Sequence, residues 1–149
     1  MLYRLDELDI RILRELLRNS RRSFHQLAEE LEVSTGTVLK RIKGMEKGRV
    51  IKAYSALLDH RKLGYELTAV TEITASNGRL KEMEKEISKI ASVCAVYDTT
   101  GSTDAIIISK FKSIDDLGNF TKTLLGMPFV NRANTHVVLN TVKEDFRLL

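Results

Sequence analysis

The sequence predicts an α+β protein with two parts: an N-terminal winged helix-turn-helix at residues 1–57 and a ferredoxin-like βαββαβ sandwich domain at 65–149, joined by a linker at 58–64. Helix caps recur at short intervals in the first third, and the excess positive charge is concentrated there. Strand and helix periodicities alternate after the linker. A chain of 149 residues is long enough for two small domains.

Three short helices are predicted in the first third, because a capping residue stands at each expected start. Asp6 is placed as the N-cap of a helix that runs to about Asn19. Ser23 opens a second helix with Gln26 at its third position, which is the pattern of a capping box. After a short break, Ser34 caps a third helix. Three helix caps within about 30 residues, separated by short breaks, indicate a compact three-helix unit.

The third helix separates apolar from basic residues. Val38, Ile42 and Met45 share one face, while the other positions are polar, small or basic. From residue 40 to 52 there are six Lys or Arg and one Glu, a net charge of +5, whereas residues 53–149 carry 12 basic and 12 acidic residues. A basic run is usually a solvated face, but here it follows two helices joined by a short turn, an arrangement that suits entry into a DNA major groove.

The candidate DNA-binding residues lie at the start and along the outer side of this third helix. Hydroxyl groups can reach base edges or phosphates, and the cations can neutralise phosphates; an arginine can also form two hydrogen bonds with guanine. The candidates are Ser23, Ser34, Thr35, Gly36, Thr37, Lys40, Arg41, Lys43 and Lys47. We therefore expect double-stranded DNA as a partner.

Strands and helices alternate in the rest of the chain. Residues 50–57 alternate like a strand that leads out of the helical unit, and residues 58–64 form the linker. Further strands are expected at 66–75, 93–100, 105–111 and 131–142, with helices from 80 to 90 and from 114 to Gly126 and Pro128. This order folds as a four-stranded sheet with both helices on one face. The other face needs a cover, which a second copy of the chain can supply.

Several classes of protein are disfavoured by composition. No apolar run is long enough to cross a membrane and no signal peptide is recognisable, so we expect a cytoplasmic protein. Cys94 is the single cysteine and lies in an apolar stretch, which excludes an internal disulfide and predicts a small core residue. We expect no metal and no cofactor.

A known family matches these features in order. The residues LDELDIRIL (5–13), Arg22-Ser23, Leu27-Ala28, STGTVLKRI (34–42) and Val50-Ile51 before Tyr54 resemble the leucine-responsive/asparagine (Lrp/AsnC) family of transcription regulators. The chain departs from that family at Gly48-Arg49, because the family more often has its glycine directly before the Val-Ile pair. The βαββαβ order also resembles the regulatory domain of the family.

The resemblance implies a sequence-specific regulator that forms homodimers and often octamers or other even multimers. Family members bind a free amino acid between dimers, near a Gly-x-x-Asp element that residues 101–104 match. By that resemblance the candidate effector-binding residues are Thr99, Gly101, Ser102, Thr103 and Asp104, with Thr135, His136 and Val137 as further candidates. An alternative is that Gly101 and Asp104 only shape the turn.

Three other functions fit the sequence less well than DNA binding does. An enzyme is disfavoured because the sequence lacks a metal-ligand, phosphate-loop or nucleophile motif. An RNA-recognition module needs aromatic residues on its strands, and here the strands carry only Tyr97 and Phe111. A protein that binds only small molecules or protein partners does not explain the basic third helix.

Overall fold

The computed structural model describes residues 4–76 and 78–149, which form two compact units. The first consists of residues up to Leu57 together with Lys143–Leu149, and the second spans Leu58–Val142. We expected the second domain at 65–149; in the structure the last seven residues group instead with the helical unit, where the Arg147 guanidinium donates to the Leu17 carbonyl at 3.5 Å.

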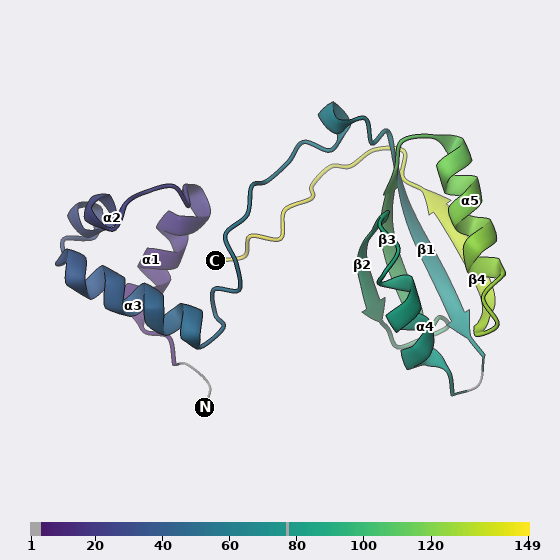
Figure 1. Cartoon of the computed structure of the whole chain (residues 1–149), viewed down its shortest axis with the longest axis horizontal. Helices are drawn as coiled ribbons and strands as arrows, with labels where there is room; N and C mark the ends of the chain where they lie inside the picture. The colour runs from purple at the N-terminus through teal and green to yellow at the C-terminus, as the bar shows by residue number, and fades with distance from the viewer. Residues whose placement is uncertain (1–3, 77) are drawn as a thin grey trace. The chain divides into compact units, whose positions relative to one another are not determined.

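The first unit contains three helices, α1 (Glu7–Arg18), α2 (Phe24–Leu31) and α3 (Thr35–Lys47) (Figure 1). The predicted caps are confirmed: the side chains of Asp6, Ser23 and Ser34 accept hydrogen bonds from backbone N–H groups of the helices that they precede. The core contains residues from all three helices: Ile12, Leu27, Ala28, Leu31, Val38, Ile42 and Met45.

The predicted strand at residues 50–57 is not formed, so the described part of this unit has no wing. Val50 and Ile51 instead donate backbone hydrogen bonds to the Met45 carbonyl at 2.9 and 3.2 Å and pack on the helical core. These bonds hold the start of the segment at the end of α3, and an extended segment without a neighbouring strand has no ladder to join.

The second unit is an antiparallel sheet in the order β2-β3-β1-β4. Its strands are β1 (Leu67–Ala75), β2 (Val93–Asp98), β3 (Ala105–Phe111) and β4 (Val130–Val137), and its helices are α4 (Leu80–Ile87) and α5 (Ile114–Leu125) (Figure 1). A 3-10 turn, η1 (Arg61–Leu63), lies in the predicted linker. The ferredoxin-like prediction is confirmed.

Both helices pack on the same face of this sheet. The core combines Met83 and Ile87 of α4, Leu117, Phe120 and Leu124 of α5, and the inward residues Ala69, Ile73, Ala105, Ile107 and Phe111 of the two central strands. Alternation along each strand places the intervening residues on the opposite face, which we call the open face. The open face carries Val70, Glu72, Ala95, Tyr97, Ile106, Ile108 and His136.

Two local expectations in this unit are wrong. The last strand ends at Val137 and not at residue 142, because its partner β1 begins at Leu67 and the final bond is from Val138 N–H to the Thr68 carbonyl at 2.8 Å. Cys94 is exposed and not in the core. A β-bulge between Val93 and Ala95 removes residue 94 from the regular pairing with β3 and therefore from the predicted inward alternation.

Candidate DNA-binding and effector sites

Helix α3 begins with a local hydrogen-bond network at its exposed N-terminus. The Ser34 hydroxyl accepts from Thr37 N–H at 3.1 Å and contacts the Thr37 hydroxyl at 2.8 Å. The preceding turn is tight, with Glu32 in the left-handed region at φ 57°. This geometry presents the first turn of α3, which contains Thr35 and Gly36, to solvent.

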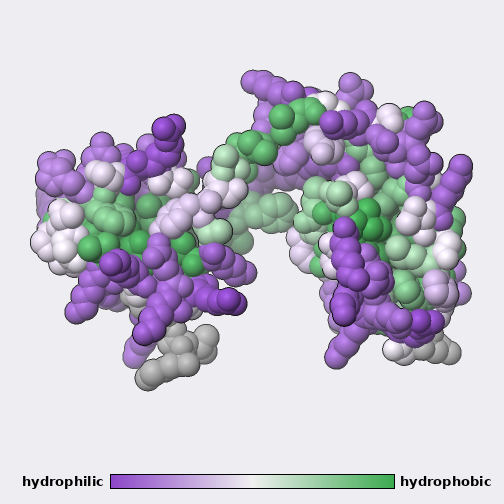
Figure 2. Space-filling view, in the orientation of Figure 1, coloured by the Kyte–Doolittle hydropathy of each residue, from purple (hydrophilic) through white to green (hydrophobic). Residues whose placement is uncertain are grey.

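The predicted DNA-binding cations fall into two groups. Lys40, Lys43 and Lys47 are exposed, and their ammonium groups form no hydrogen bond or ion pair among residues 4–76 and 78–149. In Figure 2 the surface over α3 is mostly hydrophilic. A shallow hollow of about 400 Å³ is lined by Thr37, Lys40, Arg41 and Gly44. These lysines are therefore available to DNA phosphates.

Arg41 belongs to the other group, because it is engaged inside the protein. Its guanidinium donates to the carboxylates of Asp6 and Asp9, which lie at the start of α1. A hydrogen bond from the Asp9 backbone lowers the pKa of Asp6, partial burial opposes that shift, and Arg41 lowers the pKa further. The arrangement gives Arg41 a role in holding α3 against α1, which the sequence pattern did not indicate.

Ser23 lies away from the first turn of α3 in sequence and serves its own helix. It exchanges hydrogen bonds with Gln26, with Ser23 N–H donating to the Gln26 side chain at 2.9 Å and Gln26 N–H donating to the Ser23 hydroxyl at 3.2 Å. The residue is exposed, so its cap does not prevent a contact with a phosphate.

The predicted effector turn joins β2 to β3. Thr99 N–H donates to the Asp104 carbonyl at 3.0 Å, and the Thr99 hydroxyl donates to the Thr103 carbonyl at 3.1 Å. Gly101 has φ 115°, a conformation that side chains rarely adopt, and Ser102 is exposed. The hydrogen bonds of Thr99 to Thr103 and Asp104 therefore close the turn, and Gly101 and Ser102 at its tip are exposed to solvent.

Asp104 is half-buried and connects two strands. Its carboxylate accepts from Ala75 N–H at 2.7 Å, and its own N–H donates to the Ile73 carbonyl at 2.9 Å. Both bonds join the hairpin to the end of β1, where the pairing with β4 shifts register. These bonds therefore support the alternative hypothesis, in which Asp104 shapes the turn.

The strand candidates lie apart from the turn within one chain. Thr135 faces the helices and its hydroxyl lies 3.1 Å from that of Thr71, whereas His136 lies on the open face beside Asn134, with Nε2 to Nδ2 at 3.0 Å. Val137 is exposed at the end of β4. His136 pairs with Val70 of β1, whereas Asp104 of the turn is bonded to Ile73 and Ala75, on either side of Thr74. Val70 and Thr74 are four positions apart along β1, which corresponds to ~13 Å.

The open face of the sheet is apolar at its centre. Val70, Ile106 and Ile108 are only half-buried, and Tyr97 is 45% exposed. Phe111, the other aromatic strand residue, is buried in the core. The described open face thus lacks the aromatic platform of an RNA-recognition module, and it offers apolar area for a partner.

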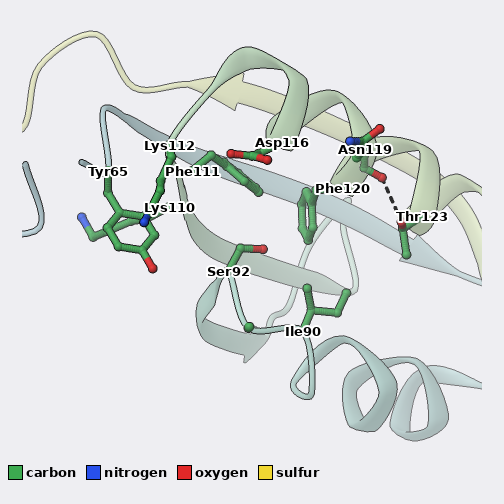
Figure 3. A pocket seen from close by; sticks show the side chains of 11 residues that line it. Tyr65, Ile90, Ser92, Lys110, Phe111, Lys112, Asp116, Asn119, Phe120 and Thr123 are labelled. Atoms are coloured by element: carbon green, nitrogen blue, oxygen red, sulfur yellow. Dashed lines mark hydrogen bonds between the residues drawn. The ribbon is translucent and has the colours of Figure 1, made fainter. Parts of the chain in front are cut away.

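The second unit contains a cavity of about 430 Å³ at a place where the sequence pattern predicts no site (Figure 3). Its lining comes from three parts of the chain: Tyr65, the loop residues 90–92, and several residues between Lys110 and Thr123. These parts meet only in the folded unit, so their combination is not visible in the sequence. Among the described residues, no group of three or more His, Cys, Asp or Glu could hold a metal ion, and no described helix is long and apolar enough to span a membrane.

Comparisons with known proteins match both units. Residues 5–46 match the AsnC-type helix-turn-helix domain, and residues 68–148 match the Lrp/AsnC ligand binding domain. An uncharacterized HTH-type transcriptional regulator of Pyrococcus abyssi is 44% identical over 144 residues, which cover 97% of this chain and 98% of that protein. The HTH-type transcriptional regulator Ptr1 of Methanocaldococcus jannaschii is 30% identical, with coverage of 97% and 98%.

A solved structure agrees over the same range. The transcriptional regulator of Neisseria meningitidis in complex with L-Met superposes with a TM-score of 0.91 at 27% identity and covers 98% of this chain and 97% of its own. The family and the matched relatives are transcriptional regulators and not enzymes. The sequence-based recognition is thus confirmed by matches to each of the two units, and the chain belongs to the Lrp/AsnC family of DNA-binding transcription regulators.

Proposed function

We propose that this regulator binds specific operators as a homodimer and that a free amino acid alters its assembly and its binding. The observation that carries the DNA-binding part is the exposed row of Lys40, Lys43 and Lys47 behind the hydroxyl-rich first turn of α3. Hydroxyls and cations on one helix can contact base edges and phosphates together.

The homodimer is supported by the open face of the sheet. Its central residues Val70, Ile106 and Ile108 form an apolar surface that one chain does not cover in the second unit. A two-fold axis places two copies of α3 in successive major grooves, ~34 Å apart, so the operator is expected to be pseudo-palindromic. Higher even multimers, including octamers, are the assembly we expect for the dimers.

The amino-acid effector is supported by the Neisseria regulator, which is described in complex with L-Met. In this chain the turn supplies exposed backbone and hydroxyl donors for a carboxylate at Gly101 and Ser102, with the half-buried Thr103 beside them. Because Thr135, His136 and Val137 lie away from the turn, we propose that they contribute from a different subunit. A cytoplasmic location remains a prediction from the sequence.

The test of DNA binding uses genomic fragments from the source organism, including the region upstream of the chain's own gene. Retention of a few fragments, weaker at higher salt, supports a specific regulator. Each lysine that contacts a phosphate contributes close to one unit to the salt slope, so Lys40→Ala and Lys43→Ala should each reduce the slope by about 1. Lys81→Ala, an exposed lysine on α4, is the control and should leave the slope unchanged.

The test of effector binding adds a mixture of free amino acids, including L-methionine, to the same assay, with and without Ser102→Ala and Thr103→Ala. A change in operator affinity or in oligomer mass that these variants abolish supports the turn site. No retention of any fragment at low salt overturns the DNA-binding assignment of α3. Retention without any response to amino acids overturns the effector part only.

A further inference from the structure

The cavity in the second unit lies at the end of the sheet opposite the effector turn. β3 starts at Ala105, directly after the turn, and ends at Phe111, which lines the cavity. Seven residues of strand separate the two places by ~20 Å. The cavity and the turn are therefore separate sites within one chain.

The inner wall of the cavity is aromatic and apolar. The rings of Phe111 and Phe120 meet with centroids 5.1 Å apart at an interplanar angle of 51°, and Ile90 of the loop between α4 and β2 lies opposite Phe120 (Figure 3). Both rings belong to the core under the helices, so the wall is held rigidly. Phe111 and Phe120 are almost completely buried, so the half-buried Ile90 supplies much of the apolar surface that an aliphatic or aromatic group of a ligand can contact.

The rim of the cavity carries opposite charges. Lys112 holds its Nζ 5.4 Å from the centroid of the Tyr65 ring. Asp116 stands in the first turn of α5, and within the described ranges its carboxylate forms no hydrogen bond or ion pair. Each residue also has a local role. The carboxylate of Asp116 interacts favourably with the dipole of α5 at its N-terminus, and the ammonium group of Lys112 makes a cation–π contact with the Tyr65 ring. Neither role accounts for an ammonium and an unpaired carboxylate at the edge of one apolar hollow.

We propose that this cavity is a second binding site for a small zwitterion with an apolar side chain, that is, a free amino acid. The Asp116 carboxylate receives the ligand's ammonium group, Lys112 receives its carboxylate, and the side chain lies toward Phe111 and Phe120. A volume of about 430 Å³ is within the range of small-ligand sites. Phe111 and Phe120 face the helices, so the site does not compete with the open face for a second copy of the chain.

The site goes beyond the proposed function because it uses no residue of the Gly101–Asp104 turn. Its occupancy would connect α5 with the loop before β2, since Asp116 and Ile90 come from these two segments. A ligand held by both segments stabilises the second unit by mass action, whatever the turn binds.

The experiment titrates the full-length chain with L-methionine and L-phenylalanine by calorimetry, and follows the Ile90 methyl group by NMR. N-acetyl-L-methionine and L-methioninamide are the matched probes, because each lacks one of the two charges. Asp116→Asn and Lys112→Met should each raise the dissociation constant roughly tenfold or more, which corresponds to the loss of one charged contact. Asp115→Asn and Lys122→Met on the same helix are charge-matched controls outside the cavity and should change nothing.

The outcomes separate this site from the turn. Shifts of the Ile90 methyl group that survive Ser102→Ala, with weak binding of both derivatives, support the second site. Binding that Ser102→Ala abolishes and that Asp116→Asn and Lys112→Met leave intact overturns it while leaving the turn site standing. If neither amino acid shifts the Ile90 signal of the unmodified chain up to the solubility limit, the proposal is also overturned, even if a cavity variant fails to fold.

Discussion

The guanidinium of Arg41 lies 3.4 Å from the Oδ2 atom of Asp9, a carboxylate with no exposed surface. The same Oδ2 atom accepts the N–H of Asp6, so one buried oxygen belongs both to the capping box of α1 and to an ion pair with α3. Helices α1 and α3 are therefore joined by a charged contact.

Replacing Arg41 by Ala should destabilise the helical unit by about 2 kcal/mol, because it leaves the buried Asp9 carboxylate without its cation. DNA affinity should fall as well, since α3 loses a fixed position, while the homodimer stays intact. Thermal unfolding measures the first effect and fragment binding the second. Lys40→Ala is the control, and it should weaken DNA binding without lowering stability. Equal stability of the two variants would contradict the positioning role.

Gly36 offers a way to separate stability from DNA binding. A Cβ atom added there would meet only the Ser34 hydroxyl oxygen, at 3.9 Å, so nothing within the described structure requires glycine. Gly36→Ala should raise the stability of α3 by up to about 1 kcal/mol. If the DNA backbone approaches this point closely, the same change should weaken operator binding at least severalfold. Unchanged operator affinity in a stabilised variant would remove Gly36 from the interface.

Arg49 adopts φ 56°, the left-handed conformation that glycine tolerates better. The family more often has glycine at this place, one residue after Gly48 of this chain. Arg49→Gly should therefore stabilise the unit by about 1 kcal/mol in denaturant unfolding. Arg49→Ala keeps the strained backbone and removes the same charge, so it should bring no such gain. A gain of equal size in both variants would assign the effect to charge.

The Asp104 carboxylate should contribute to the stability of the second unit through its bond to Ala75 N–H. Asp104→Ala leaves that N–H without its acceptor and should cost about 1–2 kcal/mol, whereas Asp104→Asn keeps an acceptor oxygen and should cost less. Urea unfolding distinguishes the two. If both variants respond to L-methionine like the unmodified chain, Asp104 is structural and does not bind the effector's ammonium group.

The phenol of Tyr54 should lose its proton at a higher pH than an ordinary tyrosine. Partial burial, together with a hydrogen bond to the Glu46 carboxylate at 2.9 Å and the charge of that carboxylate, raises the pKa of this half-exposed phenol to about 12. The folded pKa lies above the unfolded value of 10.0, so the stabilisation from this contact is present below pH 10 and is lost as the pH rises from 10 to about 12. Ultraviolet difference titration should show a late phase that Tyr54→Phe removes. Glu46→Gln should shift this phase to lower pH; an unmoved phase would contradict the Glu46 contribution.

Local patterns in the sequence were sufficient for the helices of the first unit. Asp6, Ser23 and Ser34 cap helices because a hydroxyl or carboxylate accepts backbone N–H groups only three residues away. The alternation of apolar and polar residues at 66–75 likewise predicted the strand β1, and the β-branched run at 105–111 predicted β3. The order of elements then limited the second unit to one sheet topology.

Segments that depend on a distant partner were predicted less well. Residues 50–57 alternate like a strand, but Met45 and the helical core hold their first residues and no strand pairs with them in the described chain. Cys94 was expected in the core, and a bulge that is visible only in the pairing with β3 exposes it. Periodicity describes one segment at a time and contains no information about its neighbour.

The sequence by itself determined the family, the three helices of the first unit, the order of the elements in the second unit and the exposed basic helix, because these depend on spacing within short segments. The tertiary structure alone decided which charged side chains are engaged in contacts within the protein and which are available to a ligand or to DNA. Arg41 and Asp9 lie 32 positions apart, and Ala75 and Asp104 lie 29 apart. Each pair forms only after helices or strands pack together, so two residues selected as ligand contacts became parts of the framework. The cavity likewise forms only in the folded unit, because Tyr65 and Ile90 come from parts of the chain distant from Phe111 and Phe120.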